Sequence, residues 1–252
     1  MRYHVLAAAL VAICAATAPA QSAADHIAAG DRAYLSLEAA SALASYEKAI
    51  EADSGSYEAL WKASRSAVDI GSHVSDAQRR ASLFARGEQY ARRAVALSPA
   101  DAEGHFSLAR ALGKTALTQS PRGRIRYATD IRQEALKCLA TAPRHAGCLH
   151  VMGMWNAEVM RLSSITRTIA RNLLGGRIFG TASWKEAVRY MEAAVAAEPD
   201  RIVHRVDLGE VYADVGEKEK ARAEFETALR LAVTDVNDNL YKEQARRALR
   251  SL

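Results

Sequence analysis

A helix–turn–helix pattern near the C-terminal end of the chain constrains the fold most. Between residues 183 and 233, segments with helical periodicity alternate with breaks at Pro199 and Gly216. The small Gly209 would let two antiparallel helices approach closely, and the ring of Phe225 would fill the space between them. A single helix pair of this kind cannot bury its apolar face alone, so the pattern predicts neighbouring pairs of the same kind.

The residues of this stretch have the spacing of a tetratricopeptide (TPR) repeat. The matching positions are Leu208, Gly209, Tyr212, Ala221, Phe225 and Ala228. More degenerate copies precede it, and their turns are marked by Ser54, Pro99, Pro143 and Pro199. The sequence therefore predicts an all-α, TPR-like, right-handed α-α superhelix over residues 21–252. It should contain about five degenerate helical pairs, an inserted amphipathic helix and a C-terminal capping helix.

Helical segments and one loop follow from this register. Helices are expected over 23–36, 38–52, 56–70, 77–97, 101–116, 124–141, 145–160, 183–197, 201–215, 218–232 and 237–252. Asp76 and Ser183 are expected N-caps, because their side chains can accept hydrogen bonds from backbone N–H groups of the first turn. Residues 119–123, which include Pro121, are expected to form a loop.

An insertion between Arg161 and Ala182 has the pattern of a basic amphipathic helix. Ile165, Ile169 and Leu173 share one helical face, Arg167 and Arg171 lie on another, and Gly175-Gly176 should end the helix. Such a helix can bind a membrane surface or a partner. Packing of its apolar face against the chain's own repeats is the preferred interpretation.

Residues 1–20 read as a cleaved signal peptide. Arg2 precedes the apolar run from Val5 to Ala18, and Ala18-Pro19-Ala20 resembles a cleavage site. The apolar run is too short to span a bilayer, and no later segment is apolar enough for a transmembrane helix. We therefore expect an exported protein, periplasmic or secreted.

The positive charge of the chain is small and unevenly placed. The formal net charge is +5, and basic residues concentrate in 110–144 and 161–177. Such regions can steer acidic partners towards a protein, although a solvated face is the preferred interpretation. Export and the lack of a broader basic and aromatic platform argue against nucleic acid as a partner.

Neither a catalytic site nor a cofactor site is predicted. The sequence contains no zinc-protease, phosphate-loop, nucleophile-elbow or dinucleotide motif, so an enzyme is not expected. Outside the signal peptide the cysteines are Cys138 and Cys148, which flank the turn at Pro143. A disulfide between them is plausible in an oxidising compartment, although two buried free thiols are the preferred interpretation. His145 and His150 lie near Cys148, but their spacing matches no recognised zinc pattern, so no metal site is predicted.

The chain resembles the TPR domain of the regulator of microtubule dynamics family from about Leu108 to Leu249. The residues that carry the resemblance are His150, Gly153, Trp155, Arg167, Ala170, Leu173, Trp184, Glu186 and Ala187. Ser164 departs from the pattern, which would have an aromatic residue there. The resemblance implies an all-α superhelical fold and much less about the role of the protein. Microtubule association does not transfer to an exported protein, and the lipid binding attributed to some eukaryotic relatives is an alternative.

In a TPR array, the resemblance implies that the first helix of each pair lines the concave surface. The expected partner-binding residues on this surface are Trp61, Arg65, Phe106, Arg110, Lys114, His150 and Met154, and Asp69 falls on the same surface. An aromatic residue is twice followed one turn later by Arg, which offers an apolar shelf beside a guanidinium that can bind an acidic group. In the alternative interpretation, slightly preferred, the aromatic residues pack between helices and the arginines are solvated.

These observations predict a non-catalytic TPR scaffold in the cell envelope. It would bind a protein or peptide, most plausibly an acidic one, through its concave surface. The alternative is a lipid or another hydrophobic ligand held in a cavity of the helical array, with the inserted helix as part of the cavity wall.

Overall fold

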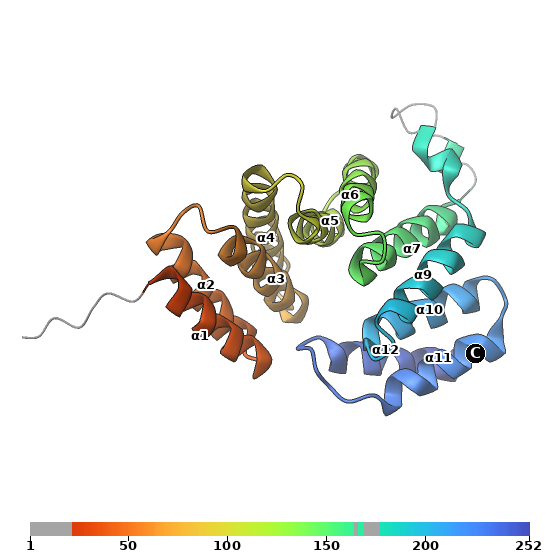
Figure 1. Ribbon diagram of the computed structural model, residues 1–252. Helices are drawn as coiled ribbons and strands as arrows, with labels where there is room; N and C mark the ends of the chain where they lie inside the picture. The colour runs from red at the N-terminus through yellow and green to blue at the C-terminus, as the bar shows by residue number, and fades with distance from the viewer. Residues whose placement is uncertain (1–21, 164–165, 169–176) are drawn as a thin grey trace, which may run out of the picture.

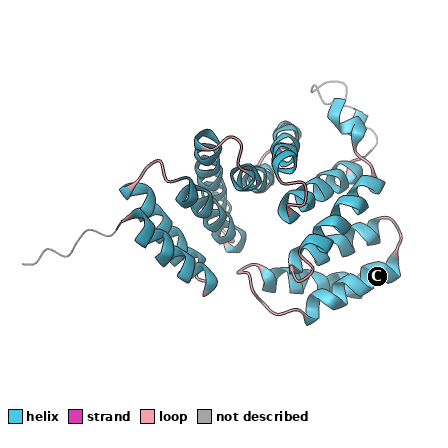
Figure 2. Ribbon diagram, in the orientation of Figure 1, coloured by secondary structure: helices cyan, strands magenta, loops and turns pink. Residues whose placement is uncertain are grey.

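The computed structural model describes residues 22–163, 166–168 and 177–252 (Figure 1). Throughout this part of the chain the regular structure is helical, with no strand (Figure 2). The elements are α1 (Ala23–Leu35), α2 (Ala39–Ala52), α3 (Tyr57–His73), α4 (Ala77–Leu97), α5 (Ala102–Ala116), α6 (Pro121–Thr141), α7 (Ala146–Arg161), η1 (Arg177–Thr181), α9 (Trp184–Ala197), α10 (Ile202–Asp214), α11 (Lys218–Arg230) and α12 (Asp238–Ser251).

The helices pack as successive antiparallel pairs along a curved array (Figure 1). The pairs are α1 with α2, α3 with α4, α5 with α6, α7 with α9, and α10 with α11. The final helix, α12, packs against both α10 and α11 and covers the last pair. The prediction of an all-α, TPR-like array of five pairs with a capping helix is therefore confirmed.

Each pair is joined to the next by the same turn, which explains why the array repeats so regularly. At the end of α4, the Ser98 N–H donates to the carbonyl of Ala94, and the Asp101 N–H then donates to the carbonyl of Ser98. Equivalent hydrogen bonds close the turns at Asp53–Ser56, Ala142–His145 and Glu198–Arg201. The positions that Ser54, Pro99, Pro143 and Pro199 mark in the sequence all lie in these turns.

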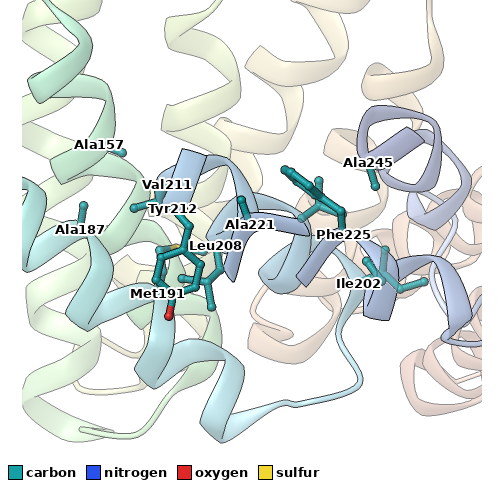
Figure 3. Packing of buried hydrophobic residues seen from close by; sticks show 12 residues of the cluster. Ala157, Ala187, Met191, Ile202, Leu208, Val211, Tyr212, Ala221, Phe225 and Ala245 are labelled. Atoms are coloured by element: carbon teal, nitrogen blue, oxygen red, sulfur yellow. The ribbon is translucent and has the colours of Figure 1, made fainter. Parts of the chain in front are cut away.

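Small residues allow the two helices of a pair to approach closely, as the last pair shows (Figure 3). A Cβ atom added to Gly209 of α10 would lie 2.6 Å from Cε1 of Phe225 on α11, so only glycine fits against this ring. Ala221 and Ala228 are fully buried on the same face of α11. The packing predicted from the sequence is therefore present, and it builds the largest apolar cluster of the C-terminal half.

Two predicted boundaries are wrong: α3 continues to His73, beyond the expected end at residue 70, and α6 begins earlier than expected. The segment 119–123 was expected to be a loop, but helix α6 starts at Pro121. The hydroxyl of Ser120 accepts a hydrogen bond from the Gly123 N–H and caps the helix. Proline is well tolerated at the first helical position, since its missing N–H would have no partner there. The expected N-caps Asp76 and Ser183 do accept from the N–H groups of Arg79 and Glu186.

Two expected segments lie largely outside the described residues. The predicted signal peptide, residues 1–20, is one of them, and most of the inserted amphipathic helix, including Ile165, Ile169 and Leu173, is the other. Of the insertion, the structure describes a helical turn over 166–168 and the short helix η1. Among the helices described, none combines the length and the apolar character that crossing a membrane requires.

Candidate functional site: the concave surface

The first helices of the pairs form the inner side of the curved array. Each of α1, α3, α5 and α7 contacts the first helix of the next pair, in the order α1, α3, α5, α7, α10. We call the inner side formed by these five helices the concave surface (Figure 1). All seven residues expected there are half-buried rather than fully exposed.

The aromatic–arginine pair on α3 is partly covered by a tyrosine of the first helix. The guanidinium carbon of Arg65 lies 3.5 Å from the ring centre of Tyr34 and 5.3 Å from that of Trp61. A guanidinium so close to an aromatic face is held by a cation–π interaction. Within the described part of the chain, Arg65 forms no ion pair and its buried Nε has no hydrogen-bond partner.

The second such pair, on α5, is built into the fold. A Cβ atom on Gly147 would lie 2.4 Å from Cε2 of Phe106, and the Phe106 ring also packs against His145 at 4.9 Å between ring centres. Phe106 is thus a wedge between α5 and α7. Arg110 donates to Asp69 of α3, whose side chain is fully buried. Phe106 thus packs between helices as the packing interpretation expects, whereas Arg110 is not solvated as that interpretation has it but is paired with a buried carboxylate of α3.

Lys114 is a second cation of this surface that, like Arg65, has no ion pair among the described residues. Among the described residues no carboxylate oxygen lies within 4 Å of its ammonium group, although Asp69 and Asp207 are close enough to influence it. Burial lowers the pKa of Lys114, and the neighbouring charge of Arg110 lowers it further. A partly buried cation without a counter-ion favours the approach of an anion.

Two histidines and an aspartate meet where α7 faces α10. His150 Nε2 lies 2.7 Å from Asp207 Oδ2, and the rings of His150 and His204 are 4.9 Å apart. Burial lowers the pKa of His204 to about 2, with further contributions from His150 and Arg201. Met154, one turn after His150, packs against the apolar cluster of the C-terminal pair. These residues join the fourth pair to the fifth.

The segment between α11 and α12, Leu231–Asn237, reaches across to the opposite end of the concave surface. We call it the α11–α12 loop; Figure 1 shows it directed towards the first pairs. Its Asp235 accepts hydrogen bonds from Arg201 Nη2 at 2.8 Å and from the Tyr34 hydroxyl at 3.2 Å. Its Asn237 donates to Asp69 Oδ1 at 2.7 Å. The loop therefore connects the last pair to the first two.

The Tyr34 hydroxyl lies between two carboxylates and has only one proton to share. It is 3.1 Å from Asp69 Oδ2 and 3.2 Å from Asp235 Oδ2. A phenol donates one hydrogen bond at a time, so the two carboxylates compete for it. The guanidinium groups of Arg110 and Arg201 balance the negative charge, one on each carboxylate.

Four residues of this hydrogen-bond network were not among the binding residues predicted from the sequence. Tyr34, Arg201, Asp235 and Asn237 lie in helix ends and loops, where helical periodicity carries no information. Tyr34 and Asp235 are 201 residues apart in the sequence. The available signal was weak: polar residues on both sides of Val236, Asp235 and Asn237, in the break before the last helix.

Cys138 of α6 and Cys148 of α7 are joined by a disulfide, which differs from the preferred interpretation of two free thiols. The turn between the two helices brings their Cα atoms to 6.4 Å, within the range that a disulfide spans. Ligand atoms of Cys138, Cys148 and His145 lie within 4.8 Å of one another. Each sulfur is bonded to the other, and His145 Nδ1 accepts from the Cys148 N–H, so this group holds α6 and α7 together.

The paired helices and their inner side define the class of the protein: a TPR-like helical-repeat protein. The chain belongs to the Regulator of microtubule dynamics protein 1-3 family, whose sequence model matches residues 24–252. The match is longer than the resemblance recognised in the sequence, and it includes the first two pairs.

Two relatives illustrate the extent of the similarity. The chain is 26% identical over 160 residues to Regulator of microtubule dynamics protein 3 of Xenopus laevis, which is 63% of this chain and 34% of that protein. The match thus spans about a third of the length of the curated relative. Among solved structures, a thermophilic TPR protein of Thermus thermophilus is similar, with a TM-score of 0.63 and 20% identity. That similarity covers 89% of this chain and 99% of the other, and it shows the shared fold.

Proposed function

We propose that this protein is a non-catalytic scaffold that binds a protein or peptide partner through its concave surface. The observation that carries the proposal is the pair of cations, Arg65 and Lys114, that face this surface without an acidic partner among the described residues. Charge complementarity gives specificity and speeds association, so these cations favour an acidic segment. Membership of a TPR-like family supports the same proposal.

The proposed location is the cell envelope. The predicted signal peptide motivates it, and the disulfide between Cys138 and Cys148 supports it. Structural disulfides persist in oxidising compartments and are rare where thiols are kept reduced. A direct measurement is the fractionation of cells that express the full chain, followed by detection of the protein and sequencing of its N-terminus.

The binding proposal is tested with substitutions that remove the two unpaired cations. Arg65→Gln/Lys114→Gln should lose partners that the wild type captures from an envelope extract, as detected by quantitative mass spectrometry. Lys48→Gln/Lys185→Gln, at exposed positions of α2 and α9, is the matched control and should retain them. Equal recovery by all three proteins would reject the concave surface as the binding site. Arg110 is unsuitable for this test, because its substitution would leave the buried Asp69 unpaired.

A lipid chain remains the alternative ligand, with less support from the described residues. A cavity of about 310 Å³ has a mixed lining: charged groups such as Arg161 and Asp214 disfavour an acyl chain, whereas apolar side chains such as Phe225 also border it. The helix expected to wall a lipid cavity lies mostly outside the described residues. Native mass spectrometry of gently purified protein would show a bound lipid mass if the alternative holds.

A further inference from the structure

The α11–α12 loop occupies part of the surface that the proposed function assigns to a partner. Asp235 and Asn237 are almost fully buried, with 3% and 4% of their surface exposed. They are buried against polar groups of other repeats: Tyr34, Asp69 and Arg201. The loop therefore lies on the concave surface in the manner of a bound peptide, with an aspartate carboxylate as its anchor.

The site around Asp235 is suited to an ionised carboxylate. Burial alone would raise the pKa of Asp235, but the charge of Arg201 and the backbone N–H of Asn237 outweigh burial, so the pKa lies below its ordinary value. The charge of Arg110 acts in the same direction. The Asn237 N–H belongs to the loop itself, so the groups of other repeats that favour a carboxylate here are the Arg201 guanidinium and the Tyr34 hydroxyl. Hydrogen bonds between ionised partners are about twice as strong as neutral ones.

The loop is also held by hydrogen bonds within itself. Asp238 Oδ2 accepts hydrogen bonds from the N–H groups of Thr234 and Asp235, at 2.8 and 2.7 Å, and forms a compact turn. Asp235 Oδ1 in turn accepts from the N–H of Asn237 at 2.9 Å. A turn that is held by its own hydrogen bonds can leave a binding surface without unfolding.

The loop is attached to the concave surface mainly by polar contacts. Of its apolar side chains, Val233 is 37% exposed, Leu231 packs against the apolar cluster of its own C-terminal pair, and Val236 is half-buried. Hydrogen bonds to charged groups are stronger than those between neutral groups. A partner that supplies an equivalent carboxylate would restore most of what the departing loop gives up, so exchange between loop and partner is energetically feasible.

We propose that the α11–α12 loop is an internal ligand of the concave surface, and that an acidic partner binds by placing a carboxylate where Asp235 lies. The proposal rests on the proposed function and specifies it further. The partner segment would be an aspartate-bearing turn, with a polar side chain two residues after the aspartate, as in the loop itself. The loop would compete with this segment and lower its apparent affinity until it is displaced.

The test uses a fluorescein-labelled peptide with the sequence of the loop and its closing residue, LAVTDVND, added to the full chain. Binding is measured by fluorescence anisotropy. In Asp235→Ala/Asn237→Ala the internal ligand no longer occupies the surface, so this variant should bind the peptide at least tenfold more tightly than the wild type does. A peptide carrying Asp235→Asn should bind the variant at least tenfold more weakly. Asp200→Ala/Asn239→Ala, at exposed positions, is the matched control and should behave as the wild type.

Two outcomes would overturn the inference. One is the same affinity, within twofold, for the wild type and the released variant. The other is no binding to the released variant up to about 2 mM peptide, a concentration comparable to that of a segment tethered by a short linker. Circular dichroism establishes that the variant is folded; if it is not, Asp235→Asn, which keeps the side-chain shape, takes its place in the same comparison.

The result separates this inference from the proposed function. Partners lost from Arg65→Gln/Lys114→Gln without any peptide binding to the released variant would leave the function standing and reject the internal ligand. Peptide binding without any partner that depends on those cations would support the internal ligand and reject the function.

Discussion

Arg110 on α5 donates to Asp69 on α3, and the Asp69 side chain is completely buried. This relationship assigns a structural role to an arginine that the sequence placed in a ligand site. Burial alone would lower the pKa of Arg110, but the charge of Asp69 outweighs burial and raises it. The Arg110 guanidinium therefore keeps its charge, and the buried Asp69 depends on it as a partner.

Replacing Arg110 should destabilise the fold far more than replacing its neighbour Lys114. Arg110→Met leaves the buried Asp69 without its cation, which costs about 3–5 kcal/mol. Lys114→Met removes an ammonium group that forms no ion pair within the described ranges, so the free energy of unfolding should change by less than about 1 kcal/mol. Urea denaturation followed by circular dichroism measures both values. Equal losses in the two variants would contradict the structural role of Arg110.

Acidification should destabilise the protein through His204. The pKa of His204 is about 2 in the folded chain, against an ordinary value of 6.5. Below pH 6.5 the unfolded chain binds a proton at this histidine while the folded chain does not, so stability falls as the pH falls. This group alone should lower the free energy of unfolding by about 2 kcal/mol between pH 7.5 and pH 5.

The variant His204→Phe isolates this effect. Its stability should decrease less with acid than that of the wild type, by the same amount of about 2 kcal/mol over that range. His73→Phe, at an exposed position near the end of α3, is the matched control and should keep the wild-type dependence. Parallel pH profiles for wild type and His204→Phe would show that the folded chain binds a proton at His204 as readily as the unfolded chain does, which would contradict the prediction.

Reduction should weaken the junction between the third and fourth pairs. The disulfide closes a short loop, since Cys138 and Cys148 are 10 residues apart, and the loss of such a crosslink costs about 2–3 kcal/mol. Thermal unfolding with and without dithiothreitol measures the effect. Cys138→Ser/Cys148→Ser should match the reduced wild type and be insensitive to the reductant. A wild type that is equally stable in both conditions would argue against the crosslink.

Two glycine substitutions should change stability in opposite directions. Gly209→Ala places a Cβ atom 2.6 Å from the Phe225 ring and should cost about 1–3 kcal/mol through overpacking. Gly113→Ala lies in α5, where nothing is within 4 Å of the added carbon, and alanine favours a helix by about 0.5–1 kcal/mol. Midpoints of urea denaturation distinguish the two. A stabilised Gly209→Ala would mean that α10 and α11 separate easily.

The local parts of the fold were predictable, because they depend on neighbouring residues. The turn markers and the small residues, such as Gly209 against Phe225, define helices and pairs within a few tens of residues. The register also placed Asp69 and Arg110 on one surface, although not as an ion pair. Their distance depends on how tightly successive pairs pack, and helical periodicity does not contain that information.

The long-range part of the candidate site was not predictable from the sequence. The contact between Tyr34 and Asp235 depends on the accumulated curvature of the whole array, to which every pair contributes a small rotation. A small error per pair would move the loop away from the first helix. The predicted start of α6 is wrong for a local reason. Proline usually interrupts a helix, but Pro121 occupies the first helical position, where it is well tolerated.

The hydrogen bond between Tyr34 and Asp235 also changes how the protein should respond to unfolding or truncation at one end. An open solenoid frays from its termini, and loss of a terminal repeat is felt mainly by the adjoining one. Here the two ends support each other, so truncation before Asp235 would also destabilise the first helix, 201 residues away in the sequence. The stability of each end of the array should therefore depend on the other end, in contrast to an open solenoid.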